Sequence, residues 1–403
     1  MSNQPYPPQG GPASYPPGPP VNLPQGGGGP GLVIQMIGLG CGGIATFLLA
    51  GLLLLVFLAE LGPGLFVVAV VMAFVPAVFY MSIVLLIDRF DPEPPWLLAL
   101  AFLWGAVISI FGALIINDTA ALVAASAGGP AAAEFVGAVI AAPISEEAMK
   151  GIGLLIVLIA LRKEFDGVVD GIVYACVIAL GFATVENVLY YGRSLGEAGA
   201  AGGAVTLVLR GLMSPFAHPL FTAMTGIGVG IAREQRRGFV ARIAPVLGYA
   251  AAVLLHATWN FVATVSSAGG GAELFFGVYL VGWIPAFLCF MAAIGYCLYR
   301  ERKIIRQYLY EEVALGVISP QEYLWVTSLR KRWGFHWRAF SAGGLHGYNC
   351  ARAFSRAATK LALSKWHTLK AAEKNTQTRS LGQIPLLRQE LTAKRAAFAA
   401  QSA

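Results

Sequence analysis

Eight long apolar runs between Gly31 and Tyr299 constrain the fold of this chain more than any other feature of its sequence. Crossing the ~30 Å hydrocarbon core of a bilayer takes about 20 helical residues, and each run is long enough. Hydrophobic residues make up 57% of the chain and charged residues only 12%, whereas soluble domains carry about 25% charged residues. We therefore predict an all-α, polytopic membrane helix bundle of about eight transmembrane helices. The predicted spans are residues 32–59, 62–87, 96–116, 133–161, 171–191, 205–232, 243–265 and 275–299.

The two ends of the chain differ in composition from this apolar body. Residues 1–30 contain ten prolines and no charged side chain. Such a segment cannot bury enough apolar surface to fold, so we predict a disordered Pro/Gly-rich arm. Residues 300–403 have the composition of a soluble segment. The predicted organisation is an arm over 1–30, a membrane domain over 31–299 and a basic, partly helical tail over 300–403.

Two helices are predicted in the tail. The first begins at Ser319-Pro320-Gln321-Glu322, a capping box in which Ser is the N-cap, Pro is the first helical residue and Glu reaches back. The second is predicted over 351–374, with Lys and Arg on several faces. It either lies against anionic lipid headgroups, where each nearby cation contributes about 1 kcal/mol, or stays solvated without a specific contact.

The formal net charge of +7 would suggest nucleic acid as a partner if the protein were soluble. The charges are, however, unevenly distributed along the chain. Residues 300–403 hold 18 Lys/Arg and 6 Asp/Glu, whereas residues 1–299 hold 10 and 15. A basic tail on a mildly acidic membrane domain accounts for the net charge, so no nucleic-acid partner is predicted.

The Lys and Arg residues between the spans indicate the orientation, because cytoplasmic loops are enriched in both. With the N-terminus in the cytoplasm, the inner segments carry Arg89, then Arg162 and Lys163, then four Arg between 233 and 242, and then the tail. The outer loops near 117–132 and 266–274 carry none, and the loop near 192–204 carries only Arg193. We therefore predict an integral protein of a bacterial-type plasma membrane with both termini in the cytoplasm.

Ionisable residues inside the spans are the main indication of function. Glu146, Glu147 and Lys150 lie near the middle of the fourth span, where each charge costs roughly 2.5–3.5 kcal/mol on insertion scales. Glu146 and Lys150 are four residues apart on one helix face, so we expect them to pair. Glu147 points about 100° away from that face and is expected to be left for another role.

Each of the next three spans also carries a carboxylate or an imidazole. Pro215 and Pro219 flank the histidine of the sixth span, and two prolines four residues apart predict a kinked or opened helix. A single buried polar residue can be a packing hydrogen bond, but four consecutive spans of this kind predict one shared buried site. The additional site residues are Glu186 and Asn187 in the fifth span, His218 in the sixth, and His256 and Asn260 in the seventh.

These residue types suit metal-assisted hydrolysis. Imidazoles and carboxylates are Zn²⁺ ligands, and a catalytic zinc keeps an open position for water, whose pKa it lowers. His218, His256 and a carboxylate, with Glu186 as a candidate, would supply three ligands. A nearby Glu would act as general base and then as acid toward the leaving amine. Asn260 would orient an imidazole or stabilise the oxyanion.

The depth of these residues in their spans favours a site in the outer half of the membrane. Counted from the outer ends of their spans at 1.5 Å per residue, Glu147, His218 and His256 lie about 15–20 Å deep and Glu186 about 8 Å deep. The competing hypothesis is an ion- or proton-coupled transporter with a Glu/His relay. Such transporters contain broken helices that recur in both halves of the chain, whereas the polar residues here occur only in the second half of the series of spans.

The four polar motifs together resemble the PrsW family of intramembrane proteases, part of a wider superfamily of CAAX prenyl proteases and bacteriocin-processing enzymes. The resemblance covers roughly residues 80–265 and includes the acidic, proline-bearing stretch at 88–95. It does not cover the arm, the first span or the tail. The motifs that carry it are Glu146-Glu147-x-x-Lys150, Phe182-x-x-x-Glu186-Asn187, a lone His218 and His256-x-x-x-Asn260.

This resemblance implies a multi-helix membrane peptidase with Glu146, Glu147, His218 and His256 as catalytic candidates. It also implies that the Glu pair activates water while the histidines bind metal or the oxyanion; a zinc-dependent and a glutamate-dependent reaction both stay open. The substrate would be a membrane-anchored protein, since relatives of the type member cleave a membrane-spanning anti-sigma factor on its outer side and so start regulated proteolysis. A third hypothesis is an inactive member that serves as a binding scaffold.

Overall fold

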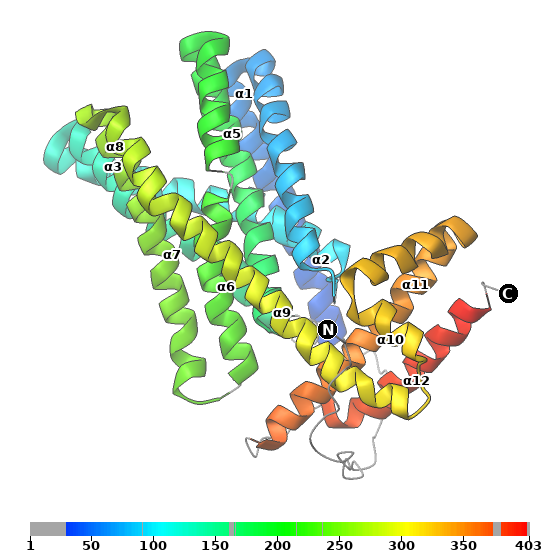
Figure 1. The fold of residues 1–403 in the computed structure, drawn as a ribbon. Coiled ribbons are helices and arrows are strands. Elements are labelled where there is room, and N and C mark those ends of the chain that lie inside the picture. Colours follow the sequence, from blue (N-terminus) through cyan, green and yellow to red (C-terminus); the bar gives the residue numbers. More distant parts are fainter. Residues whose placement is uncertain are drawn as a thin grey trace. The chain divides into compact units, whose positions relative to one another are not determined.

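The computed structural model describes residues 30–90, 92–160, 165, 167–214, 216–235, 237–373 and 380–400, and the regular elements in these ranges are all helices (Figure 1). The predicted all-α fold is therefore confirmed. The predicted disordered arm lies outside the described residues except for Pro30, and so do Arg162, Lys163, Pro215 and Arg236.

The helices fall into two compact units. The first, here called the membrane domain, comprises residues 28–89 and 93–295. The second, here called the tail domain, contains residues 90–92 and the chain from Tyr296 onward. The helices of the membrane domain are α1 (Pro30–Ile87), α2 (Pro95–Leu103), η1 (Trp104–Ser109), α3 (Ile110–Phe135), η2 (Val136–Ala141), α4 (Ala142–Ala160), α5 (Val168–Thr206), η3 (Leu207–Met213), α6 (Ala217–Gln235), α7 (Phe239–Val265), η4 (Ser266–Gly270), α8 (Gly271–Val278), η5 (Tyr279–Trp283) and the start of α9 (Ile284–Ala314), where η denotes a π-helix.

Four helical stretches in the described residues are long and apolar enough to cross a membrane: Gly42–Ile87, Pro95–Ala160, Val168–Gln235 and Phe239–Ala314. Each is interrupted by glycine in the left-handed region, with φ between 64° and 122°. Side chains with a Cβ avoid this region, so the breaks fall at glycine. They are at Gly62, Gly129, Gly199, and Gly269 with Gly271. The eight predicted runs lie one on each side of these breaks, and the number of crossings stays a prediction.

Helix α5 is the central helix of the membrane domain. Every residue from Ile172 to Leu180 is no more than 3% exposed, as expected for a helix surrounded on all sides. It packs against α1, α2, η1 and α6. A Cβ on Gly171 or on Gly226 would lie 2.2 Å from the carbonyl oxygen of the other residue. These two glycines therefore allow the close approach of α5 and α6, which carry two of the predicted site motifs.

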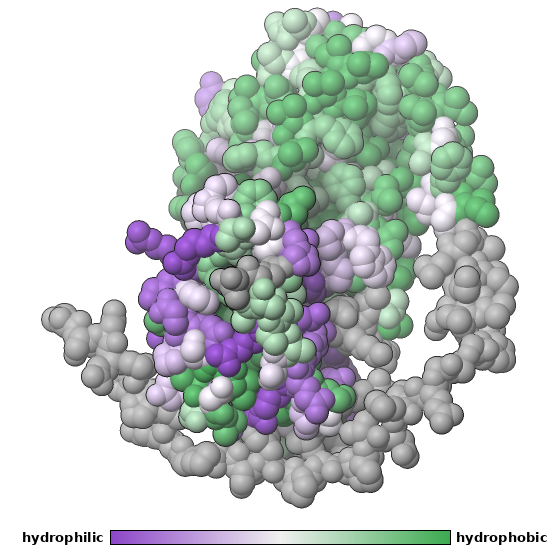
Figure 2. Space-filling model, turned by 90° about the vertical axis from the view of Figure 1, so that its right-hand side faces the viewer, coloured by the Kyte–Doolittle hydropathy of each residue, from purple (hydrophilic) through white to green (hydrophobic). Residues whose placement is uncertain are grey.

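The outer surface of the membrane domain is covered by large apolar side chains, including Phe47, Val75, Leu122 and Leu247, each at least 60% exposed. Figure 2 shows this continuous hydrophobic surface in green. A soluble protein exposes no apolar surface of this extent, whereas lipid tails would cover it. The protein is therefore an integral membrane protein, as predicted.

The tail domain is a helical unit with its own apolar core. Its helices are α10 (Pro320–Thr327), α11 (Leu329–Glu373), α12 (Ser380–Ala399) and the end of α9. The predicted capping box is present: the Ser319 hydroxyl accepts from the Glu322 amide at 3.2 Å, and the Glu322 carboxylate accepts from the Ser319 amide at 2.6 Å. The core includes Phe90, Ile305, Leu309, Phe335, Phe354 and Leu361.

The predicted helix over 351–374 forms the second part of α11, after a break at Gly343 and Gly344. One of its faces is buried in the tail core through Ala351, Phe354 and Ala358, so it is not fully solvated, and its contact with anionic lipid stays a prediction. Buried Lys365 pairs with Glu312 and lies 2.8 Å from Glu311. The helix is therefore part of a folded domain with an apolar core. Its many basic residues made this core hard to predict from the sequence.

Candidate active site

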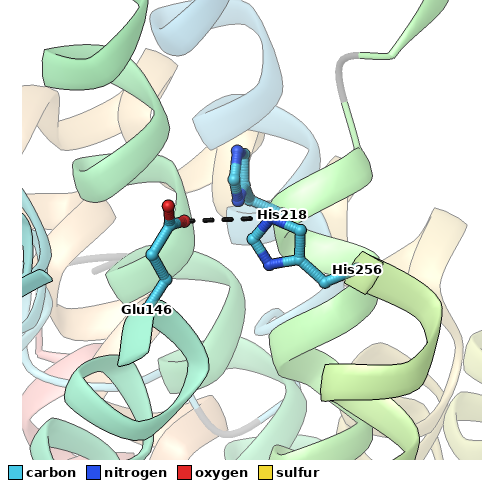
Figure 3. Close-up of side chains that lie close together, drawn as sticks. All are labelled: Glu146, His218 and His256. Carbon is cyan, nitrogen blue, oxygen red and sulfur yellow. Dashed lines mark ion pairs between the residues drawn. The ribbon is translucent and has the colours of Figure 1, made fainter. Parts of the chain in front are cut away.

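Three helices of the membrane domain bring a carboxylate and two imidazoles together. Glu146 comes from α4, His218 from the first turn of α6 and His256 from the middle of α7. One ligand atom from each lies within 4.8 Å of the others. Figure 3 shows Glu146 pointing toward His256, with His218 beside them. Glu146 and His256 are 5% and 2% exposed, and His218 is half-buried.

Breaks in regular helix position two of these side chains. The π-helix η3 ends at Met213, and α6 begins at Ala217 with Pro219 in its first turn. Proline is tolerated there because the first amides of a helix have no intrahelical acceptor. The predicted opening around His218 is thus present, although Pro215 itself lies outside the described residues. Glu146 likewise lies in the first turns of a helix that follows a π-helix, η2, and π-helical segments are frequent at functional sites.

Glu147 is completely buried and has three polar neighbours. Its Oε1 lies 2.9 Å from Nζ of Lys150 and 3.1 Å from Nδ1 of His256, and its Oε2 accepts a 2.8 Å hydrogen bond from Thr222. Glu147, which was expected to be left for another role, therefore also pairs with Lys150. Lys150 Nζ does approach Glu146 as expected, but at 3.4 Å, because its flexible side chain reaches both carboxylates of the adjacent turn.

Both imidazoles have one nitrogen directed at a carboxylate. His256 points Nδ1 at Glu147, so this nitrogen carries the hydrogen and Nε2, 3.9 Å from Glu146, keeps its lone pair. His218 has Nδ1 3.1 Å from Lys150 Nζ and Nε2 3.0 Å from Oε2 of Glu186. Since an ammonium only donates, Nδ1 of His218 accepts and Nε2 carries the hydrogen. The two histidines are therefore fixed in opposite tautomers.

Glu186 and its neighbour Asn187 are held by Arg210, which comes from the π-helix η3. The guanidinium lies 2.5 Å from Oε2 of Glu186 and donates a 2.6 Å bond to Oδ1 of Asn187. It also stacks over the ring of Tyr190, with 3.7 Å between its carbon and the ring centroid. Arg210 therefore balances the charge of the Glu186 carboxylate.

A cavity of about 600 Å³ borders this cluster. Its wall includes Asn260, whose side-chain amide donates a 2.8 Å bond to the carbonyl of Ala138 in η2. Glu147 and Lys150 are not part of the wall. The other predicted site residues that line the cavity are Glu146, Glu186, Asn187, His218 and His256. The adjacent carboxylates of α4 therefore differ in position: Glu146 faces the cavity and Glu147 lies behind it.

Sequence reasoning missed Thr222. This residue lies one helical turn after His218 on α6, so the i, i+4 spacing places both on one face and would have identified it. Its small hydroxyl is common in membrane helices, where it usually bonds to its own backbone. In the structure it bonds to the buried carboxylate of another helix instead.

The donor set fits a zinc ion. Two imidazoles and one carboxylate are a ligand combination of catalytic zinc sites. Glu186 on His218 and Glu147 on His256 are carboxylates of the kind that orient metal-bound histidines. Glu146, rather than the candidate Glu186, is the carboxylate in the converging triad. Lys150 lies against the same His218 nitrogen, so a bound ion would take the lone pair that accepts from this ammonium.

Comparisons with known proteins agree with the motifs. A family model described as PrsW family intramembrane metalloprotease matches residues 93–290. Protease PrsW of Geobacillus kaustophilus (strain HTA426) is 31% identical over 168 residues, covering 41% of this chain and 68% of that protein. Protease PrsW of Bacillus subtilis (strain 168) is 29% identical over 196 residues, covering 48% and 81%. No solved structure matches the chain.

The matched segment contains every predicted site residue, from Glu146 to Asn260, and ends before the tail domain. It therefore includes the converging carboxylate and imidazoles, the residues that hold them and the walls of the cavity except Val56, Phe57 and Glu60 of α1. The site geometry and the similarity lead to the same assignment. The chain belongs to the PrsW family of intramembrane proteases.

Proposed function

We propose that this membrane-embedded protease cleaves a peptide bond of a membrane-anchored protein inside the cavity bordered by Glu146, His218 and His256. The observation that carries the proposal is the convergence of these three side chains from three helices on one cavity wall. A volume of about 600 Å³ suits a short extended peptide segment rather than an intact helix. The scissile segment therefore unwinds before it reaches the site.

In the glutamate-dependent scheme, in which no metal takes part, Glu146 is the proposed general base. It is the member of the Glu pair that borders the cavity, so its carboxylate can reach a water molecule beside a bound peptide. It takes a proton from the attacking water and returns it to the leaving amine. The peptide C–N bond and one O–H bond of the water break, a C–O bond and an N–H bond form, and the products are a carboxylic acid and an amine.

Glu147 and Glu186 are proposed to position the histidines. Each accepts from one imidazole nitrogen and so fixes the ring; the other lone pair stays available on His256, whereas on His218 it faces the Lys150 ammonium. Imidazole lone pairs directed at the centre of the triad suit the histidines as metal ligands. They do not suit stabilisation of an oxyanion, because an oxyanion needs hydrogen-bond donors. Asn260 keeps one amide hydrogen beyond its bond to Ala138 and is the proposed oxyanion donor.

Zn²⁺ is the proposed cofactor, held by Glu146, His218 and His256. When bound, it would lower the pKa of a water molecule and polarise the scissile carbonyl. The same residues also permit a glutamate-dependent reaction, in which Glu146 alone activates the water. Metal content of the purified protein, with His256→Ala as the control, separates these two schemes.

The proposed substrate class is a membrane-spanning regulatory protein such as an anti-sigma factor, cut near the outer interface. This proposal rests on family resemblance and on the predicted depth of the site. We further propose a bacterial plasma membrane with both termini in the cytoplasm, based on the distribution of Lys and Arg, together with contact between the basic tail and anionic lipid and no nucleic-acid partner. Family membership does not favour the transporter hypothesis.

The test is a comparison of new peptide N-termini in membranes that contain the wild-type protein or Glu146→Gln. Glu134→Gln is the matched control, because Glu134 also lines the cavity but is exposed and outside the triad. We expect N-termini near outer membrane interfaces that are present with wild type and the control and absent with Glu146→Gln. Identical sets of N-termini for all three proteins would contradict the proposal.

A further inference from the structure

The first part of α11 exposes a row of three aromatic side chains, here called the aromatic ridge. Trp333, Trp337 and Phe340 are 72%, 58% and 38% exposed. Their spacing of four and three residues places them on one helix face. Their rings lie nearly parallel, with centroids 6.2 Å apart for the two tryptophans and 5.7 Å apart for Trp337 and Phe340. The ridge is therefore a continuous apolar surface one aromatic ring wide.

The ridge is not the side of α11 that packs into the tail domain. Arg332, Phe335 and Ala339 occupy that buried side, at 4%, 2% and 7% exposure. Trp325 of α10 covers the same side, stacked on Phe335 with 4.5 Å between ring centroids. The helix thus has one aromatic surface that completes the core and a second that the described tail residues leave uncovered.

Basic side chains flank the ridge. Arg330, Lys331 and Arg338 are exposed. Arg330 lies directly beside the three aromatic residues, whereas Lys331 and Arg338 lie about 120–140° round the helix on the same side. There is no Asp or Glu anywhere between Glu322 and Glu373. The ridge therefore lies in a positively charged segment with no acidic side chain to offset it.

Tryptophan and cationic side chains on neighbouring faces of one helix are the features of a helix that lies in a membrane interface. Indole rings favour the headgroup level, and Lys and Arg favour anionic lipid. The ridge also follows the last stretch of the chain that is long and apolar enough to cross a membrane, so the tail domain is tethered to a membrane-spanning segment. A protein surface would match the aromatic residues but gives no reason for the uncompensated positive charge.

We propose that the aromatic ridge is a membrane-docking surface that inserts Trp333, Trp337 and Phe340 into the interface of an anionic bilayer, with Arg330 on the headgroups and Lys331 adding to the positive charge of the segment. It identifies a different surface from the predicted helix over 351–374, one of whose faces is buried in the tail core. It is independent of the substrate and of proteolysis, since it concerns only the tail domain. It assigns the partner by chemistry: phosphatidylglycerol-like headgroups rather than a zwitterionic surface.

The test uses the full-length protein in nanodiscs of phosphatidylcholine, with or without phosphatidylglycerol, and with or without brominated acyl chains that quench tryptophan. The fluorescence of wild type minus that of Trp333→Phe/Trp337→Phe isolates the two ridge tryptophans and keeps the ridge apolar. The matched control is the difference between wild type and Trp325→Phe, which reports a tryptophan packed on Phe335. Arg330→Gln/Lys331→Gln tests the contribution of charge.

We expect bromine to remove most of the ridge signal in anionic nanodiscs and little of the Trp325 signal. The loss should shrink in pure phosphatidylcholine, in Arg330→Gln/Lys331→Gln and at high salt, because salt screens exposed charges. A ridge signal that bromine leaves unchanged in anionic nanodiscs would overturn the proposal. A signal shifted to the blue but unquenched would show that protein covers the ridge, and equal quenching in both lipids would refute anionic selectivity.

Discussion

The hydroxyl of Thr222 donates a 2.8 Å hydrogen bond to Oε2 of Glu147, and both side chains are completely buried. Because the other oxygen of Glu147 faces Lys150 and His256, both ends of this carboxylate are fixed. A carboxylate so fully engaged holds its neighbours in place. This arrangement explains why two adjacent glutamates on one helix have different proposed roles.

Thr222→Val is expected to lower cleavage by roughly tenfold, or about 1.4 kcal/mol in the barrier. It leaves Oε2 of Glu147 without its hydroxyl donor, which also costs about 1–3 kcal/mol of stability. Cleavage assays and thermal unfolding measure the two effects. Thr225→Val is the matched control, because the buried Thr225 hydroxyl has no hydrogen-bond partner among the described residues. Equal effects of the two substitutions would show that the bond to Glu147 is unimportant.

Arg210→Met is expected to reduce cleavage strongly and to destabilise the protein by about 2–3 kcal/mol, since Glu186 keeps its charge and loses its ion-pair partner. Arg210→Lys should have a cleavage rate and a stability between those of the wild type and Arg210→Met, because Lys retains the charge but cannot hold Glu186 and Asn187 together. Arg193→Met is the control, as its pair with Glu60 is exposed and should change stability by less than about 1 kcal/mol. Wild-type cleavage by Arg210→Met would exclude a positioning role.

Gly171→Ala is expected to lower the melting temperature and cleavage together. The added Cβ would lie 2.2 Å from the carbonyl oxygen of Gly226, so α5 and α6 must separate, at a cost of about 1–3 kcal/mol. That shift moves Glu186 relative to His218. Gly277→Ala is the control, because a Cβ there meets no atom within 4 Å. An unchanged Tm for Gly171→Ala would mean that this helix contact is looser than described.

The tail domain is expected to lose stability as the pH falls from about 6.5 to 4. Burial, with Arg332 and Arg352 nearby, lowers the pKa of His336 to about 4, from about 6.5 in an unfolded chain. Between these values the unfolded state binds more protons, so acid favours unfolding. The effect at pH 5 is about 1–2 kcal/mol after allowing for partial exposure.

Thermal unfolding of the full-length protein at pH 5 and pH 7.5 measures this loss. His336→Gln removes the titrating group and should make the transition of the tail less sensitive to pH. His346→Gln is the control, because His346 is exposed. If His336→Gln retained the full pH dependence, the acid sensitivity would come from another group.

The sequence alone predicts the fold class and the candidate site residues, because both depend on features that are rare in proteins. Long apolar runs have few possible folds, and a carboxylate such as Glu186 inside one is too costly to be incidental. The helix breaks are different. The chain has 48 glycines. Gly62 and Gly129 each precede a proline, which marks a helix boundary, but no such pattern distinguishes Gly199, with its left-handed backbone, from the glycines that continue a helix.

The atom-level pairing of the site could not be predicted because it depends on the rotation of each helix about its axis. Counting residues gives the depth of Glu146 and Glu186, but the direction of each side chain depends on packing and on the π-helices. That is why Glu146 joins the histidines in the converging triad while Glu186 pairs with Arg210. The tail core was missed for a related reason: five of the eight buried apolar side chains of α11 after Gly344 are Ala, and these small residues give a weak hydrophobic pattern among the numerous charged residues.

The position of Phe90 affects how this protein can be shortened. Phe90 belongs to the tail domain, is 1% exposed, and its carbonyl accepts a 3.0 Å bond from Arg332, although it precedes α2 in the chain. A protein ending at Tyr296 would keep the whole family-matched segment and yet leave this ring without its packing partners. A fragment that contains only the membrane domain therefore needs a polar residue in place of Phe90. Without this substitution, poor expression of the truncated protein would reflect the exposed Phe90 ring rather than a function of the tail domain.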